Sequence, residues 1–290
     1  MRLIKHILAP FAVNNFLWKI TEFLIKPINF LQAKRNQVLN QRQASFRQGE
    51  ASSGYSWLNS ITASKKVLHG PFEGMCYPSL RSVGSTLYPK LIGCYERELH
   101  FLIEQLCMEP YSEIIDIGCA EGYYAVGLGL RIPDAKIIAF DTNEEARKLC
   151  LDMAKLNGIA HRTEVQSLCT ANTLKDFCFT KGLVICDCEG YETSLFNETN
   201  IQNLLQCDLL IETHDFININ ISTQIADLFM STHDITLIQS IDDIQKAKLY
   251  EYRETQDMDL ETKKLFFAEK RPSTMEWLFL KSKQMRRQVE

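Results

Sequence analysis

The chain has 290 residues, of which 46% are hydrophobic, so it can bury the core of one α/β domain of ordinary size and still carry an extension. This composition excludes a disordered chain, and the net charge of −4 is too small to predict binding to nucleic acid. No apolar run approaches the roughly 18 residues of a transmembrane helix. The ten cysteines include no C-x-x-C pair, which favours buried, reduced thiols in a cytoplasmic protein over zinc ligands or disulfides.

The N-terminal region differs in charge from the rest of the chain. Residues 1–50 carry eight Lys and Arg against two Glu, a net of +6, and the remainder carries a net of −10. Apolar residues recur at helical spacing through residues 1–48, interrupted by Pro10 and Pro27, which predicts a basic helical extension. Packing on its own domain or homodimerisation is the favoured interpretation, and peripheral contact with an anionic membrane is the alternative. A polar linker follows, so residues 1–69 form the first predicted region.

Residues 70–108 predict a second region that leads into the sheet. Residues 70–78 are rich in turn formers and aromatic side chains, which is typical of a segment that wraps a surface. Residues 95–102 have the pattern of an amphipathic helix that ends before Pro110.

Residues 109–290 alternate short apolar runs with helical patterns, which predicts an α/β fold with a mostly parallel sheet. Strands are expected at residues 114–117, 136–140, 163–166, 183–187, 209–212, 235–239 and 277–280. Helices are expected at residues 125–130, 144–157, 195–205 and 221–230, with a charged helical excursion at 242–271.

The ends of the first two predicted strands carry a nucleoside-binding pattern. Asp116, Gly118 and Gly122 follow the first strand, and Asp141 follows the second, where an acid can accept hydrogen bonds from ribose hydroxyls. A dinucleotide fingerprint would need further glycines where this chain has Ala120 and Tyr123. The observed pattern, D-x-G-x-x-x-G, instead resembles motif I of the class I methyltransferases that depend on S-adenosylmethionine (SAM).

That resemblance implies a Rossmann-like sheet of seven strands, whose last strand is antiparallel, and SAM as the cofactor. It also implies that acids near the first glycine hold the methionine part of SAM, that Asp141 holds the ribose, and that the end of the third strand contacts adenine. The predicted cofactor-binding residues are Asp116, Gly118, Cys119, Glu121, Gly122, Asp141, Thr142, Ser167, Leu168 and Asp187.

A sharper resemblance follows the fourth predicted strand. Residues 187–192, Asp-Cys-Glu-Gly-Tyr-Glu, look like the D-x-E-G-x-E signature of the FkbM-type methyltransferases, and residues 210–214 resemble the family's next strand, which often ends in Glu-x-His. Members of that family methylate hydroxyls of sugars, glycolipids and secondary metabolites. The resemblance therefore implies an O-methyltransferase acting on a carbohydrate or on a glycolipid- or polysaccharide-type acceptor. Residues 70–89 are then a candidate lid or acceptor wall, because methyltransferases commonly place substrate specificity in N-terminal additions. Tyr77, Tyr88 and Tyr95 would suit stacking on a sugar ring, and the alternative is an aromatic core under a wrapping segment.

Three residues are candidates for accepting the proton of the acceptor hydroxyl: Asp187, Glu189 and His214. Asp187 and Glu189 lie two residues apart and point the same way in an extended strand end, and two neighbouring carboxylates raise the pKa of one of them. Asp187 can also cap a helix, Glu189 can order the loop, and His214 can be a structural hydrogen-bonding residue. With Glu212, the two acids can hold a divalent cation, but a metal site is not favoured because acidic strand ends are common in this fold without one.

Other functions stay open on the sequence. The nearest alternative is a SAM-dependent methyltransferase of a small-molecule metabolite or of a protein. A nicotinamide oxidoreductase is disfavoured by Tyr123, and an N-methyltransferase by the sequence after the fourth strand. The alternative that is not an enzyme is a SAM-binding scaffold that its basic N-terminus holds to a membrane or to a partner.

Overall fold

The computed structural model describes residues 61–286, all of which belong to one compact unit, residues 59–290. The predicted N-terminal helix and most of the predicted linker lie outside the described residues, and the predicted region boundaries stay predictions. Within the described range, no helix has both the length and the apolar character needed to cross a membrane.

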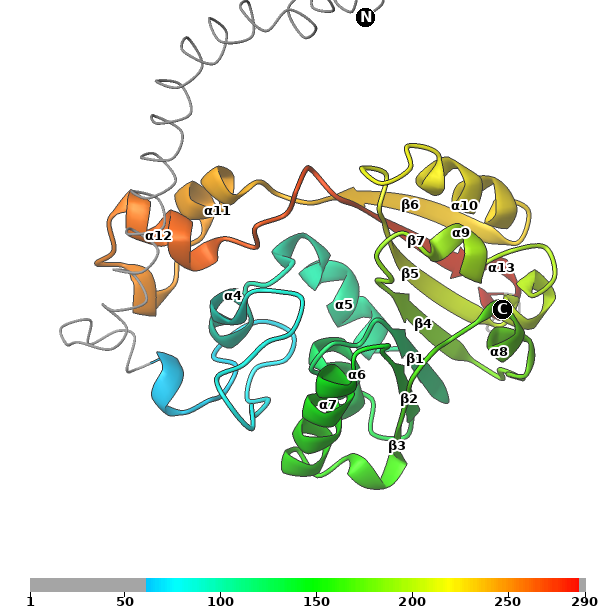
Figure 1. The fold of residues 1–290 in the computed structure, drawn as a ribbon, viewed down its shortest axis with the longest axis horizontal. Coiled ribbons are helices and arrows are strands. Elements are labelled where there is room, and N and C mark those ends of the chain that lie inside the picture. The colour runs from blue at the N-terminus through cyan, green and yellow to red at the C-terminus, as the bar shows by residue number, and fades with distance from the viewer. Residues whose placement is uncertain (1–60, 287–290) are drawn as a thin grey trace, which may run out of the picture. The chain divides into compact units, whose positions relative to one another are not determined.

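A seven-stranded sheet forms the centre of the molecule (Figure 1). Its strands are β1 Glu113–Ile117, β2 Lys136–Phe140, β3 Thr163–Gln166, β4 Gly182–Cys186, β5 Cys207–Thr213, β6 His233–Gln239 and β7 Glu276–Ser282. Their order is β3-β2-β1-β4-β5-β7-β6, and β7 runs antiparallel to both of its neighbours. This topology confirms the predicted Rossmann-like methyltransferase sheet, mostly parallel with an antiparallel last strand.

The strand order places a crevice at the carboxyl ends of β1 and β4. From β1 the chain moves outward through β2 to β3, and then returns to the other side of β1 as β4. In register, Asp116 of β1 pairs with Ala139 of β2 and with Ile185 of β4. Ligands bind at such a switch point because neighbouring connections leave the sheet in opposite directions.

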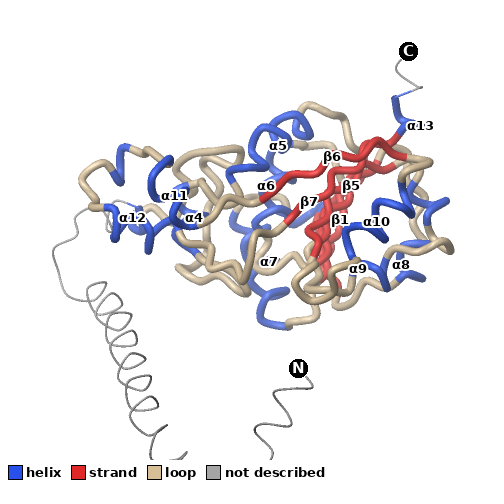
Figure 2. Tube along the Cα trace, turned by 90° about the horizontal axis from the view of Figure 1, so that it is seen from above, coloured by secondary structure: helices blue, strands red, loops and turns tan. Residues whose placement is uncertain are grey.

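Helices cover both faces of the sheet, as Figure 2 shows, with α6 and α7 on one face and α8, α9 and α10 on the other. The helices are α4 Leu87–Ile92, α5 His100–Cys107, α6 Tyr123–Arg131, α7 Glu144–Leu156, α8 Ala171–Lys175, α9 Glu192–Leu195, α10 Ile221–Phe229, α11 Asp243–Leu249, α12 Leu260–Phe267 and α13 Lys283–Arg286. Short 3₁₀ helices are η1 Arg97–Leu99, η2 Ala160–Arg162, η3 Ile201–Leu204 and η4 Arg253–Thr255. A cluster of fully buried side chains from β4, β5, α9 and α10 forms the core on the second face.

The insertion between β6 and β7 packs on the lead-in segment, and we call α4, α11 and α12 together the cap (Figure 1). The ring of Tyr88 stacks on that of Phe266, with ring centroids 5.5 Å apart. The Thr86 hydroxyl donates a hydrogen bond of 2.9 Å to the carbonyl of Ala268. The charged excursion predicted at residues 242–271 is therefore helical, and it is anchored on α4.

Two predicted helices were wrong in part. Residues 195–205 do not form one helix, because α9 ends at Leu195 and only a 3₁₀ turn, η3, follows. The amide of buried Asn200 donates 2.7 Å to the Leu195 carbonyl, so a side chain takes the acceptor that a continuing helix would have used. In the lead-in segment Glu96 has a φ of +48°, and α5 therefore begins at His100 rather than at residue 95.

Candidate active site

Two glycines shape the first loop of the site. Gly118 follows β1 with a φ of +84°, and a Cβ there would lie 1.7 Å from the carbonyl oxygen of Asp187. Gly122 begins α6 with a φ of +97°, and a Cβ there would lie 2.9 Å from the sulfur of Cys150. Both positions therefore require glycine, because the loop turns in the left-handed region while it packs on β4 and α7.

Two acids stand at the ends of β1 and β2. The Asp116 carboxylate is buried and accepts 2.8 Å from the backbone N–H of Ala125, and burial raises its pKa to about 7. The Asp141 carboxylate accepts from the N–H groups of Ala120 at 2.9 Å and Asn143 at 2.8 Å. These bonds fix the orientation of Asp141, and each of its oxygens keeps a second lone pair for a ribose hydroxyl.

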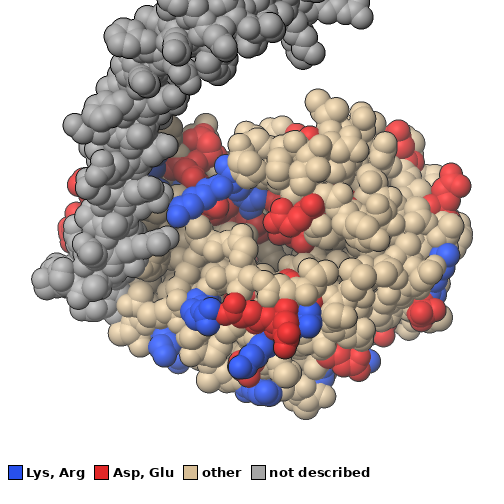
Figure 3. Space-filling model, in the orientation of Figure 1, with Lys and Arg blue, Asp and Glu red and all other residues tan. Residues whose placement is uncertain are grey.

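A cavity of about 540 Å³ extends over the carboxyl ends of β1 to β4. Its volume is within the range of small-molecule and cofactor sites. Figure 3 shows a hollow in the face of the molecule seen in Figure 1, bordered by acidic and basic side chains. Eight of the ten predicted cofactor residues line the cavity: Asp116, Gly118, Cys119, Asp141, Thr142, Ser167, Leu168 and Asp187.

The other two predicted residues lie behind the cavity wall. Gly122 begins α6, and the buried Glu121 binds the segment before α4. Its carboxylate lies 2.6 Å from the ammonium of Lys90 and accepts 3.1 Å from the N–H of Val83. Glu121 thereby fastens residues 82–90 to the first loop of the sheet.

The interpretation of residues 70–89 as a lid or acceptor wall agrees with this position, because Val83, Gly84 and Ser85 line the cavity. Lys90 also lines the cavity and was not predicted; its only signal in the sequence is that it is a single lysine within the apolar run 87–92. Of the three tyrosines considered for ring stacking, only Tyr95 lines the cavity. Tyr77 is buried and Tyr88 packs in the cap, so for these two the aromatic-core interpretation is correct.

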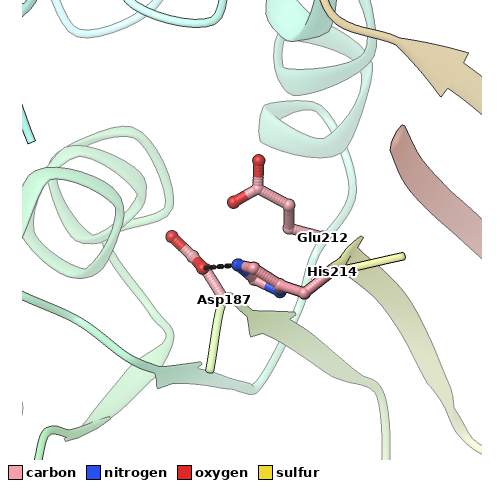
Figure 4. Close-up of side chains that lie close together, drawn as sticks. All are labelled: Asp187, Glu212 and His214. Atoms are coloured by element: carbon pink, nitrogen blue, oxygen red, sulfur yellow. Dashed lines mark ion pairs between the residues drawn. The ribbon is translucent and has the colours of Figure 1, made fainter. Parts of the chain in front are cut away.

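The three predicted catalytic residues meet at the ends of β4 and β5. Figure 4 shows two of them, Asp187 and His214. The Nε2 atom of His214 lies 3.4 Å from Asp187 Oδ1 and 3.5 Å from Glu189 Oε2. The Nδ1 atom of His214 lies 2.7 Å from Glu192 Oε1. Glu192 is fully buried in α9, and it had no assigned role in the sequence analysis although it lies within the D-x-E-G-x-E pattern. It holds the imidazole so that Nε2 faces Asp187.

The environment changes the protonation of these groups. Burial raises the pKa of Asp187 to about 7, with further contributions from the negative charges of Glu96 and Glu189 that outweigh the lowering by Glu212 and Arg271. Burial alone would lower the pKa of His214, but the hydrogen bond and charge of Glu192 reverse this, and the pKa is raised. A raised pKa keeps His214 protonated to higher pH. Asp187 is therefore better suited to accept a proton near neutrality.

A divalent cation does not fit this donor set without a rearrangement. Asp187, Glu212 and His214 each offer a donor atom, all within 4.8 Å of one another (Figure 4). However, Glu212 is paired with the guanidinium of Arg271, which also binds Glu96 and Glu269. The bond from Nδ1 of His214 to Glu192 leaves Nε2 free to be a ligand, so the obstacle to a cation is the pairing of Glu212 with Arg271. Arg271 lies in the insertion a few residues before β7. Its guanidinium neutralises the negative charges of Glu212, in β5, and of Glu96.

Comparison with known proteins gives one family match. The model of a family described as O-methyltransferase matches residues 73–210, slightly less than half of the chain. Every residue that lines the cavity falls within this range. No curated protein matches the sequence.

Several solved structures are similar in fold at low sequence identity. One is an O-methyltransferase of Streptomyces achromogenes involved in tomaymycin synthesis, in complex with SAM; identity is 12%, coverage 71% of this chain and 83% of that chain, and the TM-score 0.43. A SAM-dependent O-methyltransferase from Thermotoga maritima is 12% identical, with a TM-score of 0.43. The match covers 64% of this chain and 65% of that chain. A precorrin-6y C5,15-methyltransferase from Geobacter metallireducens is 11% identical, with a TM-score of 0.40. The match covers 62% of this chain and 88% of that chain.

Proposed function

We propose that this chain is a SAM-dependent methyltransferase that transfers the methyl group to a hydroxyl of a carbohydrate or of a glycolipid- or polysaccharide-type acceptor. The observation that carries the proposal is the position of Asp187. Its carboxylate lines the same cavity as Asp116 and Asp141, and Asp187 directly follows β4, the strand next to β1. A base so placed can reach an acceptor oxygen that approaches the methyl group in line.

Asp187 is the proposed general base. SAM, when bound, supplies a methyl group on a positively charged sulfur. An oxygen nucleophile attacks the methyl carbon, and S-adenosylhomocysteine is the leaving group. Asp187 accepts the hydroxyl proton as the oxygen forms its new bond to carbon, and it later releases that proton to solvent. Its Oδ1 is buried and lies 3.4 Å from Nε2 of His214, so this contact orients the carboxylate. A pKa of about 7 matches this task near neutral pH.

His214 and the segment before α4 would support this step. His214, held by Glu192, faces Asp187 and fixes the carboxylate while its charge changes. Val83, Lys90 and Tyr95 cover one side of the cavity, and a covered site excludes water from the reacting atoms.

Two features support a carbohydrate acceptor. The D-x-E-G-x-E pattern at residues 187–192 resembles that of the FkbM-type methyltransferases, whose acceptors include sugars and glycolipids. Four tyrosines line the cavity, and tyrosine rings combine an apolar face with a polar edge, as a sugar ring does. They are Tyr95, Tyr123, Tyr124 and Tyr191.

The cofactor site is tested by calorimetric titration with SAM and with S-adenosylhomocysteine. We expect micromolar binding to the wild type and none to Asp141→Ala, because the ribose loses its hydrogen-bond acceptor. Asp134→Ala is the matched control, since Asp134 is an exposed aspartate just before β2, at the opposite end of the strand. Equal binding by both variants contradicts the assignment of Asp141.

The reaction is tested by release of S-adenosylhomocysteine with a panel of sugars, glycolipids, phenols and peptides. Turnover of sugar-bearing compounds supports the proposal, and Asp187→Asn should then lose kcat by about 10²- to 10⁴-fold, the usual contribution of a general base. Turnover of phenols or peptides alone replaces the carbohydrate proposal with the small-molecule or protein alternative. Tight SAM binding without any turnover favours the scaffold.

A further inference from the structure

The acceptor end of the cavity is negatively charged. Asp187 and Glu189 both line this end, and Glu96 and Glu212 lie behind Asp187. Among the described residues that line the cavity, Lys90 is the only one with a permanent positive charge. Its ammonium is already paired with Glu121 and is buried. Arg271 pairs with Glu96 and Glu212, and the buried His214 faces Asp187 and Glu189. The carboxylate of Glu189, whose side chain is 75% exposed, is therefore the charge that an entering acceptor meets first.

The backbone holds Glu189 at the mouth of this end. Glu189 has a φ of +55°, which is uncommon for a residue other than glycine, and Gly190 follows with a φ of +96°. A Cβ on Gly190 would lie 2.9 Å from the Ile217 side chain, so the turn packs closely on the loop after β5. A non-glycine residue in this conformation is often retained at a functional site.

The two carboxylates at this end differ in exposure, and this difference separates their roles. The side chain of Asp187 is 34% exposed, and the side chain of Glu189 is 75% exposed. Asp187 lies deeper in the cavity, whereas Glu189 stands where an acceptor enters. Glu189 can therefore contact groups of the acceptor that do not react.

We propose that Glu189 is a specificity-determining residue and that the acceptor is a neutral or positively charged hydroxyl compound, not an anionic one. This inference rests on the proposed function and narrows its acceptor class. Glu189 accepts hydrogen bonds from hydroxyls or an amine of the acceptor, while the tyrosines contact the apolar face of its ring. Carboxylated and phosphorylated sugars are repelled by Glu189 and Asp187 together.

The experiment compares three glycosides that differ only in charge: methyl glucoside, methyl glucosaminide and methyl glucuronoside. The binding of each to the chain loaded with S-adenosylhomocysteine is followed by ligand-observed NMR, and methyl transfer from SAM is measured in parallel. We expect the glucuronoside to bind at least about ten-fold more weakly than the glucoside, as one charge repulsion near a protein surface implies.

Variants of Glu189 test whether this residue causes the weaker binding of the glucuronoside. Glu189→Lys should reduce or reverse the preference against the glucuronoside, and Glu189→Gln should lie between it and the wild type. The KM for the neutral acceptor should rise in both variants, because the acceptor loses its hydrogen bonds to the Glu189 carboxylate. Glu261→Lys makes the same charge change on the exposed surface of α12, outside the cavity, and should leave the preference unchanged.

Each outcome decides the inference. Equal binding of the glucuronoside and the glucoside overturns it, and so does a preference that Glu189→Lys leaves intact, while methyl transfer itself would still stand. If kcat collapses in Glu189→Gln, Glu189 is part of the base instead. If none of the three glycosides binds to a chain that still binds S-adenosylhomocysteine, the inference and the carbohydrate proposal fail together.

Discussion

At the scale of the residue, the environment that suits Asp187 to catalysis opposes folding. Its pKa is raised from 3.8 to about 7, chiefly by burial. A carboxyl group whose pKa is higher in the folded state stabilises the fold while it is protonated. That contribution is lost as the pH rises from about 4 through 7, because the unfolded chain then holds the ionised form more favourably. Above pH 7 the ionised Asp187 therefore lowers the stability of the fold.

We accordingly expect Asp187→Asn to raise the melting temperature more at pH 8 than at pH 4, although it removes the proposed base. Thermal denaturation of both proteins at the two pH values measures the difference. Asp134→Asn, which changes an exposed aspartate, should show no such dependence on pH. An equal change of melting temperature at both pH values for Asp187→Asn would contradict the raised pKa.

At the scale of the element, one arginine joins the insertion to the sheet and to the lead-in segment. Arg271 binds Glu212 at the end of β5, Glu96 before η1, and Glu269 beside it in the insertion. The side chains of all three acids are almost completely buried. Removal of the guanidinium takes this cationic partner from Glu96 and Glu212 in a poorly solvated place, which is costly, whereas Glu269 keeps the ammonium of Lys246 at 2.6 Å.

The expected result for Arg271→Met is a loss of about 3–5 kcal/mol of unfolding free energy, typical of breaking a buried ion pair. Denaturation by urea measures this loss. Arg81→Met provides the matched control, because the pair between Arg81 and Glu145 is well exposed and should contribute no more than about 1 kcal/mol. A loss for Arg271→Met no larger than that for Arg81→Met would show that the insertion does not depend on this contact.

At the scale of the whole molecule, the sequence predicts what is encoded locally. Each strand appears as an apolar run with a turn at its end, so the sheet and the cavity residues at the ends of β1 to β4 were predicted, with strand ends within about two residues. Contacts between distant segments leave no such pattern. Glu121 with Lys90 and Arg271 with Glu96 are 31 and 175 residues apart, and no periodicity relates them. Helices were misjudged where side chains such as Asn200 compete for backbone groups.

The pair of Lys90 and Glu121 tests whether the segment before α4 and the sheet act together in cofactor binding. Both side chains are almost completely buried, with the ammonium at the cavity wall and the carboxylate behind it. Glu121→Ala leaves the ammonium of Lys90 without its anionic partner and also removes the acceptor for the N–H of Val83. We expect it to cost about 3–5 kcal/mol of unfolding free energy and to weaken SAM binding.

The double variant Lys90→Met, Glu121→Gln removes both charges but keeps the hydrogen bond between residue 121 and the N–H of Val83. The amide oxygen of Gln can still accept from Val83, and Met fills the space of the lysine chain without a charge. Since an uncharged, well-packed replacement of a buried ion pair is often close to neutral, the double variant should recover most of the stability that Glu121→Ala loses. Calorimetry of the same proteins should then show SAM binding restored together with stability. Recovery of stability without recovery of binding would mean that the ammonium of Lys90 itself contacts the cofactor, a direct role in place of the structural one.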